Sequence, residues 1–367
     1  MKRLKRIAAA LCALGGIWGG GCALAAPVTD CPMRDAPFTA ASPVVDILLN
    51  PAAKKVLETE FPDVFTGIPA DFQSTKAPTF ASIITIRELA GWRGLKPDMA
   101  RIDAALRKVP VTAADRLARC ERYDNDVPSV SIPKGKPALL LFEKINGFRD
   151  GPSVDAAHTA FIAMAKRNGW AIVTTDRGGA FTPGFLRRFD AVIWNNISGD
   201  VLTLSQRAAL KSYMERGGGF IGVHGSAGDP VTFWDWYADG LIGARFAGHP
   251  GKPKQFQDAK IVVEGAGHPI AAGLPRDWVM NDEWYSFKNK PRAGAAKVIA
   301  TLDEASYEPG DKLRMGDHPI AWTRCVGKGR MFYSAIGHRP ETYVDAHYVT
   351  MLENAVRWAT VKTAGGC

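Results

Sequence analysis

Hydrophobic and polar positions follow two different patterns along the chain, with a boundary near residue 130. From residue 136, short continuous apolar runs alternate with stretches in which apolar residues recur every three or four positions. Such runs are typical of strands covered on both faces, and the wider spacing is typical of helices. The predicted strands are ALLLFEK, WAIVTTD, AVIWNN and FIGVH, and the predicted helices are residues 153–168 and SQRAALKSYMERG, with Ser205 as its cap. This alternation predicts an α/β fold with a doubly wound, mostly parallel sheet.

The pattern after residue 250 is richer in strands than in helices. KIVVE, KVIATLDE, IAWTRC and RMFYSAIG each have the composition of a strand, and VGKG separates the last two. A short glycine-containing connection between two strands predicts a β-hairpin. Residues 346–359 have helical spacing and predict a closing helix, so the α/β domain is expected to span residues 136–362.

Residues 26–130 instead contain several short segments with helical spacing and many Pro and Ala residues. Ser42 followed by Pro43 predicts a helix start, and Thr112 is expected to cap AADRLARCERY. Cys31 and Cys120 bracket the region, and we predict a disulfide between them. Because the region has no histidine and no glycine-rich loop, it is interpreted as a packing or docking extension.

The first 25 residues have the anatomy of a signal peptide. MKRLKR is basic, IAAALCALGGIW is apolar, and Ala23-Leu24-Ala25 fits a cleavage site, which predicts export to the periplasm or the exterior. Without the four basic residues of this segment the net charge falls from +9 to +5. No basic stripe interleaved with aromatics indicates nucleic-acid binding, and no second apolar run predicts a membrane span.

Candidate chemistry gathers where the predicted strands end, which is where open α/β sheets bind ligands. NGFRD follows the first strand, NNISGD the third, and HGS the fourth. Further polar segments are GHP, NDEWYSF, GDHPIAW and GHRPETY. Of the seven histidines, His158 and His347 fall within predicted helices and His268 within a loop-like stretch. The other four stand at predicted strand ends or loops.

Several of these segments together resemble the ThuA-like, trehalose-utilisation-like family. They are NGFRD, FDAVIWNNISGD, GGGFIGVHGSAGDPVTFWDWYADGLIGARFAGHP, NDEWYSF, MGDHPIAW and GKGRMFYSAIGHRPETY, and they span about residues 136–360. Asp150 departs from the family, many members of which have histidine after Phe-Arg. The resemblance implies a flavodoxin-like sheet, similar to class I glutamine amidotransferases, with a tight turn after one strand. It also implies a role in carbohydrate metabolism.

The predicted turn contains His224 and Ser226, and the two residues suggest different chemistry. Amidotransferases carry a reactive cysteine in the context that Gly222-Val223-His224 occupies here, so that mechanism is disfavoured because no thiolate is available. Ser226 lacks the first glycine of G-x-S-x-G and lies two residues beyond the turn, which argues against a serine hydrolase.

We therefore expect an exported protein that acts on a carbohydrate, keto-sugar or oxidised glycoside by general acid–base chemistry, through isomerisation, hydration or hydrolysis. The alternative is a non-catalytic periplasmic module that binds a sugar or docks a partner oxidoreductase. Whether the protein binds a divalent metal is left open, and no sequence motif indicates a nucleotide cofactor. The catalytic candidates are His224, Asp282, Glu283, His318 and His338, and we expect the three histidines to meet a carboxylate in one cleft. The candidate substrate-binding residues are Arg149, Asn195, His249, Trp284, Tyr285, Trp322 and Arg339.

Overall fold

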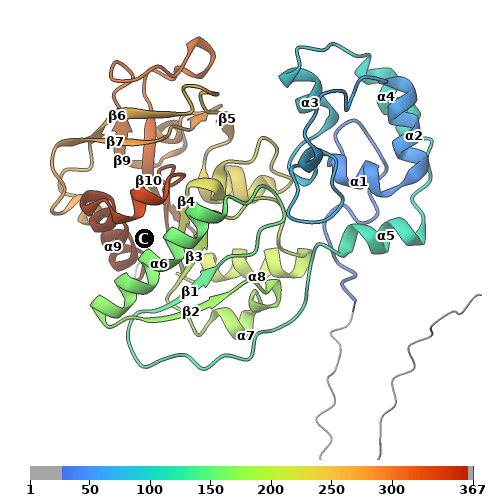
Figure 1. Cartoon of the computed structure of the whole chain (residues 1–367). Coiled ribbons are helices and arrows are strands. Elements are labelled where there is room, and N and C mark those ends of the chain that lie inside the picture. The colour runs from blue at the N-terminus through green and yellow to red at the C-terminus, as the bar shows by residue number, and fades with distance from the viewer. Residues whose placement is uncertain (1–26, 363–366) are drawn as a thin grey trace, which may run out of the picture.

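The computed structural model describes residues 27–362 and residue 367, so the predicted signal peptide lies outside the described residues. A mixed sheet forms the centre of the α/β domain, with the strand order β2-β1-β3-β4-β11-β10-β9-β6-β7 (Figure 1). Neighbouring strands pair in parallel from β2 to β11 and antiparallel from β11 to β7. The strands are β1 Ala138–Phe142, β2 Ala171–Thr175, β3 Ala191–Asn195, β4 Gly219–Val223, β6 Phe256–Val263, β7 Asp277–Glu283, β9 Lys297–Leu302, β10 Pro319–Val326 and β11 Gly329–Ser334.

The α/β fold predicted from the sequence is confirmed, and so is the hairpin of β10 and β11. All five residues of β1, β3 and β4 are buried, as expected for strands covered on both faces. The sequence did not predict β7, which is paired to β6. Its alternating exposed and buried residues belong to a strand at the sheet edge. A separate pair, β5 Phe246–Gly248 and β8 Ser286–Phe287, lies beside the main sheet.

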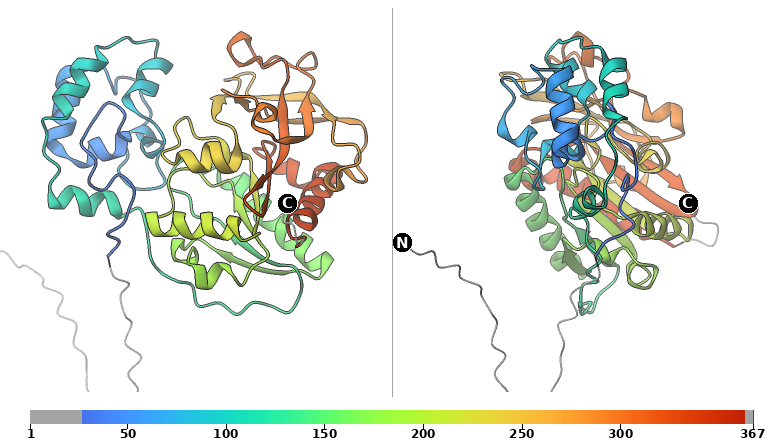
Figure 2. Two further views of the ribbon diagram at one scale, coloured as in Figure 1. Left: turned by 180° about the vertical axis from the view of Figure 1, so that it is seen from behind. Right: turned by 90° about the vertical axis from the view of Figure 1, so that its right-hand side faces the viewer.

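Helices cover both faces of the sheet. In Figure 2, α6 (Gly151–Asn168) and α8 (Leu204–Glu215) lie on opposite sides, and α9 (Ala346–Ala359) packs on β4 and β11. Asp150 caps α6, and Gly169 ends it with a φ of 68°. The prediction that Ser205 caps α8 is wrong, because Thr203 and Gln206 form a reciprocal capping box. A short helix, α7 (Pro183–Leu186), contacts α8.

The N-terminal region forms a helical cluster with a core of its own, beside the α/β domain (Figure 1). Its helices are α1 Val44–Leu49, α2 Pro51–Glu60, α3 Ile86–Trp92, α4 Met99–Leu106 and α5 Ala113–Cys120. Thr112 caps α5, as predicted. The helix start expected at Ser42 is displaced by one residue, because Pro43 is the cap of α1.

Two disulfides are present in the part of the chain that the structure describes. The predicted bond joins Cys31 to Cys120, and a second, which was not predicted, joins Cys325 to Cys367. Disulfides persist in oxidising compartments, so both are typical of a protein that functions in such a compartment. Among the described residues, no helix combines the length and the apolar character needed to cross a bilayer.

Candidate functional site

A cavity of about 410 Å³ lies at the carboxyl ends of the parallel strands. This is the edge of the sheet at which α/β proteins bind ligands. Phe148 and Asp150 follow β1, Asn196 follows β3 and His224 follows β4. Residues from β5, the end of β7, the loop after β11 and the N-terminal region complete the lining. Its polar members include Asp150, Ser153, Asn196, Ser198, His224, Asp229, His249, Gln255, Glu283, Tyr285 and His338.

His224 stands on the sharp turn predicted after β4. Its φ of 37° lies in the left-handed region, which a residue with a side chain rarely adopts, and such strain is common at functional sites. The residue is only 3% exposed, and Nδ1 of its imidazole lies 2.8 Å from the carbonyl oxygen of Ala335. Since that atom must be protonated to bond a carbonyl, Nε2 of the neutral ring is left unprotonated. The ring stacks on Tyr285, with centroids 4.1 Å apart.

Ser226 has a structural place in the same turn. Its hydroxyl donates to the carbonyl oxygen of Trp194 at 2.9 Å and accepts the N–H of Ile197 at 3.2 Å. Both bonds hold the turn to the end of β3. The side chain is buried and has no general base beside it among these contacts.

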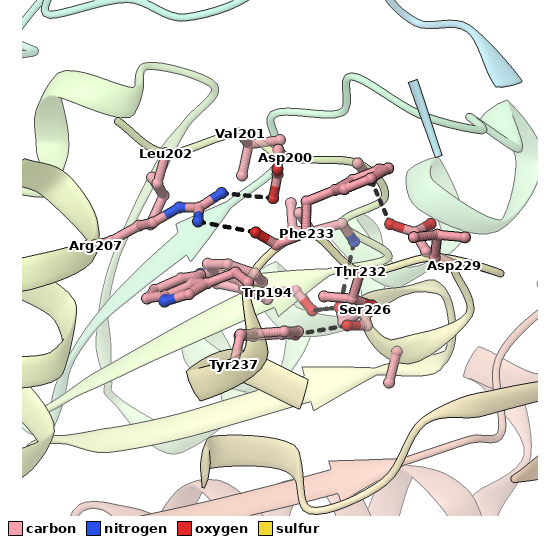
Figure 3. Close-up of a pocket in the computed structure, with 15 residues that line it drawn as sticks. Trp194, Asp200, Val201, Leu202, Arg207, Ser226, Asp229, Thr232, Phe233 and Tyr237 are labelled. Atoms are coloured by element: carbon pink, nitrogen blue, oxygen red, sulfur yellow. Dashed lines mark hydrogen bonds and ion pairs between the residues drawn. The ribbon is translucent and has the colours of Figure 1, made fainter. Parts of the chain in front are cut away.

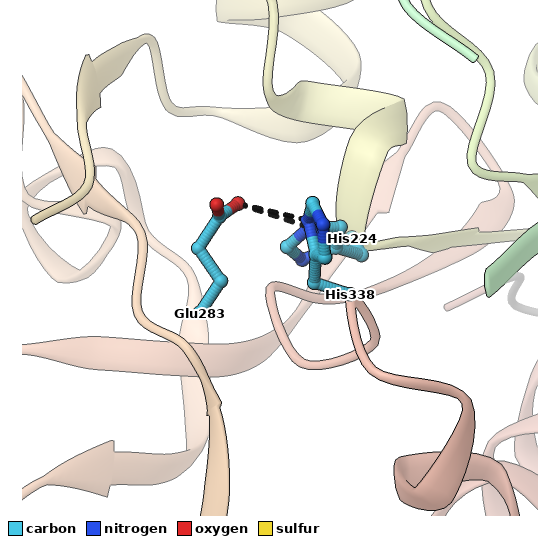
Figure 4. A group of neighbouring side chains, drawn as sticks. All are labelled: His224, Glu283 and His338. Atoms are coloured by element: carbon cyan, nitrogen blue, oxygen red, sulfur yellow. Dashed lines mark hydrogen bonds and ion pairs between the residues drawn. The ribbon is translucent and has the colours of Figure 1, made fainter. Parts of the chain in front are cut away.

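Glu283, the last residue of β7, is the centre of the site (Figure 4). Its Oε2 lies 3.4 Å from Nε2 of His224 and 3.1 Å from Nδ1 of His338, and these two nitrogens are 3.2 Å apart. Its Oε1 lies 3.2 Å from Nδ1 of His249 and accepts a bond of 2.6 Å from Nε2 of Gln255. One buried carboxylate therefore holds three imidazoles on the cavity wall.

Electrostatics reinforce this arrangement. Burial raises the pKa of Glu283, but its contacts with His224 and His338 outweigh burial and hold the pKa well below its ordinary value. Burial lowers the pKa of His338, and the bond and charge of Glu283 overcome that effect and raise it. Glu283 therefore stays a carboxylate at neutral pH.

Asp282 does not line the cavity, although it was a catalytic candidate. Successive residues of a strand point to opposite faces, so Asp282 and Glu283 cannot both face the cavity. Its carboxylate accepts the backbone N–H groups of Gly337, His338 and Arg339 at 2.6, 3.1 and 3.0 Å. Burial raises its pKa despite these contacts. The carboxylate fixes the loop that presents His338.

His318 also lies outside the cavity lining. Of the three histidines that were expected in one cleft, only His224 and His338 lie there. Its Nδ1 is 2.8 Å from Oε1 of Glu304, and its Nε2 is 2.9 Å from the carbonyl oxygen of Tyr285. His249 takes the third place at Glu283. The role of His318 in the structure is to support the backbone of Tyr285 from behind.

The expected substrate-binding residues divide in the same way. His249 and Tyr285 line the cavity, whereas the other five do not. Trp284 and Trp322 are core residues whose indole N–H groups bond to backbone carbonyls. Asn195 is fully buried, where it donates to Glu143, and Arg149 pairs with Asp155 at the surface. Arg339 bonds to Asn281 and Glu341.

Sequence reasoning missed several residues of the cavity. Asp150 was noted only as a departure from a family pattern, yet its Oδ2 lies 3.9 Å from Nε2 of His338. Gln255 stands in a loop without a motif. Phe80, Ile83 and Trp92 come from the N-terminal region, which was interpreted as a packing or docking extension and in which no site residue was predicted. Trp92 is 52% exposed, which is unusual for a large aromatic, and no sequence pattern marked it as part of a site.

A second, much smaller cavity of about 30 Å³ lies beside the first (Figure 3). Arg207 points from α8 to Asp200, with which it forms an ion pair of 2.7 Å, and its guanidinium covers the ring of Trp234. Asp229 borders both cavities and accepts bonds from the hydroxyl of Ser198 and the N–H of Gly199. Burial outweighs these bonds and raises the pKa of Asp229 to about 7.

The α/β domain is similar to known proteins. A family model described as ThuA, trehalose utilisation, matches residues 138–359. A putative ThuA-like protein from Bacteroides uniformis ATCC 8492 is 26% identical, with a TM-score of 0.55, over 66% of this chain and 98% of that chain. One from Parabacteroides merdae ATCC 43184 is 16% identical, with a TM-score of 0.47, over 62% and 91%. A comparison with curated proteins found no match. The structure of the Bacteroides uniformis protein supports the α/β fold described above.

Proposed function

The chain belongs to the ThuA, trehalose utilisation, family, and from this membership and the geometry of the cavity we propose that it acts on a keto-sugar or oxidised glycoside by general acid–base chemistry. The family supports a carbohydrate-related role. The observation that carries the proposal is the single carboxylate of Glu283, which contacts three imidazoles on the wall of one cavity. We place the protein in the periplasm or outside the cell, which suits its disulfides.

His249 is the residue that we assign to move the proton. Its Nδ1 contacts Oε1 of Glu283 and the carbonyl oxygen of Pro250, so the neutral ring carries its proton on Nδ1 and keeps Nε2 as an acceptor. Its side chain is 33% exposed, compared with 4% for His224. The nearby carboxylate stabilises the imidazolium that forms when Nε2 takes a proton, as in a catalytic His–Asp pair.

The remaining polar groups suit the carbonyl side of such a substrate. A proton on the carbon next to a keto group is acidic because its removal places negative charge on the keto oxygen. His338 lies beside His224 in the cavity, and its raised pKa favours the imidazolium, a positively polarised group that stabilises that oxygen. Enolisation is the first step of an isomerisation, and it also opens the way to loss of a glycosidic substituent. Tyr285 and Phe246 present apolar ring surface to the sugar.

Exchange of hydrogen for deuterium next to the keto group tests the assignment directly. We expect the protein to catalyse this exchange on a keto-glucoside in D₂O, as followed by proton NMR. His249→Gln should slow the exchange by about 10²–10⁴-fold, the usual contribution of a general base. His158→Gln is the matched control, because His158 also contacts a carboxylate, that of Glu143, but lies outside the cavity.

The same experiment separates the two classes of function. Binding of keto-glucosides without exchange or turnover would replace the proposal with the non-catalytic sugar-binding module. Exchange that persists unchanged in His249→Gln would remove His249 from the assigned role. Copurification with an oxidoreductase, in the absence of sugar binding, would favour the docking alternative.

A further inference from the structure

Three side chains of the cavity present their ligand atoms to one point. They are Nε2 of His224, Nδ1 of His338 and Oε2 of Glu283, separated by 3.2, 3.4 and 3.1 Å. A zinc ion with ligands at about 2.0–2.1 Å in a tetrahedral site sets the ligand atoms about 3.3 Å apart. The three separations therefore have the size that a common metal ion imposes. Figure 4 shows both imidazoles turned toward the same carboxylate.

Hydrogen bonds around these atoms leave the ligand positions free. Nδ1 of His224 bonds to the carbonyl oxygen of Ala335, which directs the lone pair of Nε2 toward the cluster. Gln255 and His249 occupy Oε1 of Glu283 and leave Oε2 for another partner. Metal-binding histidines and carboxylates are commonly oriented in this way by partners on their other polar atom.

The three atoms lie close enough together to share one cation. Nε2 of His224, Nδ1 of His338 and Oε2 of Glu283 are within 3.4 Å of one another, and each carries a lone pair in the unprotonated form that a metal ligand adopts. A bound cation would take the place of the protons that these atoms share.

We propose that His224, His338 and Glu283 bind one divalent transition-metal ion of the zinc type at the buried end of the cavity. Two imidazoles and one carboxylate form a donor set that binds such ions in preference to Mg²⁺ or Ca²⁺, because those two ions favour oxygen ligands. All three side chains line the cavity, so the remaining coordination positions face it. These open positions face the place that the keto oxygen of the proposed substrate would occupy, and the site leaves His249 free to carry the proton.

Zinc titration tests the site without any sugar. The purified, oxidised protein is treated with a chelator, dialysed and titrated with Zn²⁺ by calorimetry, and with Co²⁺ followed by visible absorption. We expect one ion per chain with a submicromolar Kd, and Co²⁺ bands of the intensity typical of four- or five-coordinate sites. Neither Mg²⁺ nor Ca²⁺ should compete.

Variants assign the ligands. His338→Gln and Glu283→Gln should weaken Zn²⁺ binding by more than about 100-fold, and Gln255→Leu by about 10-fold, as expected for a residue that only orients a ligand. His158→Gln should bind as the wild type does. Circular dichroism checks folding. Zn²⁺ should also raise the Tm of the wild type but not that of His338→Gln, since a ligand stabilises only the state that binds it.

Three results would overturn the proposal. They are no zinc binding by the wild type at micromolar concentrations, unchanged affinity in folded His338→Gln and Glu283→Gln, or an equal loss in His158→Gln. The inference stands apart from the proposed activity. Zinc binding without turnover would remove only the activity, whereas turnover with no bound metal would remove only the ion.

Discussion

At the scale of single residues, Asp229 shows how burial changes the chemistry of an ordinary carboxyl group. It lies partly buried between the two cavities, and its bonds from Ser198 and Gly199 offset the effect of burial only in part. Its pKa in the folded protein is about 7, compared with 3.8 for the free side chain. The folded state therefore binds this proton more tightly than the unfolded state does.

This difference predicts that Asp229 makes the protein less stable as the pH rises. Below about pH 4 both states are protonated and the favourable contribution is complete. Between about pH 4 and 7 the unfolded chain loses this proton while the folded protein keeps it, so the favourable contribution to the free energy of unfolding is lost. At 1.36 kcal/mol per pKa unit, the loss is about 4 kcal/mol at most. Asp229→Asn cannot ionise, so its free energy of unfolding relative to the wild type should increase across this range. Urea denaturation at several pH values measures the difference, with Asp155→Asn as an exposed control; curves that stay parallel would contradict the prediction.

The residue scale also shows where the sequence was informative about the site. His224 and His338 were expected because each follows a predicted strand, and Glu283 was expected as a carboxylate in the polar segment NDEWYSF. The alternation of side chains along a strand allows only one of Asp282 and Glu283 to face the cavity, but β7 itself was not predicted, so its register could not be used. His318 stands just before β10, and its separate bond to Glu304 depends on tertiary packing that no local pattern records.

At the scale of elements, apolar periodicity was sufficient to predict most of the parallel strands and their crossover helices. Caps were less predictable, because Thr203 and Ser205 are both good capping residues and only the reciprocal bonds of Gln206 distinguish them. The docking of α3 against the cavity left no sequence pattern at all. Its end residue Trp92, with Phe80 and Phe148, forms an aromatic edge of the cavity.

This aromatic edge predicts a contribution of the N-terminal region to sugar affinity. Trp92→Ala removes an exposed ring from the cavity and should weaken the binding of a keto-glucoside by roughly 0.5–1.5 kcal/mol, or about 2–10-fold in Kd. Stability should change by less than about 0.5 kcal/mol, because the site is at the surface. Leu117→Ala, at an equally exposed apolar residue of α5, is the control and should not change Kd. Calorimetric titration that gives equal Kd values for both variants would show that the edge is not used.

At the scale of the whole molecule, the described residues form two large apolar cores, and residues of both regions line one cavity. The core of the helical region and that of the α/β domain are separate clusters. Residues 121–137 connect the regions with no helix or strand. Sequence patterns predicted each region, but the way in which two cores dock depends on surface complementarity rather than on periodicity. This is why the cavity wall from residues 80–92 was not foreseen.

The two disulfides close loops of different length in the chain. Cys31 and Cys120 are 89 positions apart and close nearly the whole helical region, whereas Cys325 and Cys367 are 42 positions apart and tie the end of the chain to β10. Because a cross-link removes more freedom from the unfolded chain when its loop is longer, Cys31→Ser/Cys120→Ser should cost more stability, about 2–4 kcal/mol. Hydrogen exchange should become faster first in α1–α5, whose core is separate, while β1, β3 and β4 keep their protection. Cys325→Ser/Cys367→Ser is the comparator, with a smaller loss. An equal loss in both variants, or loosening of the central strands before the helices, would mean that the two cores unfold as one unit.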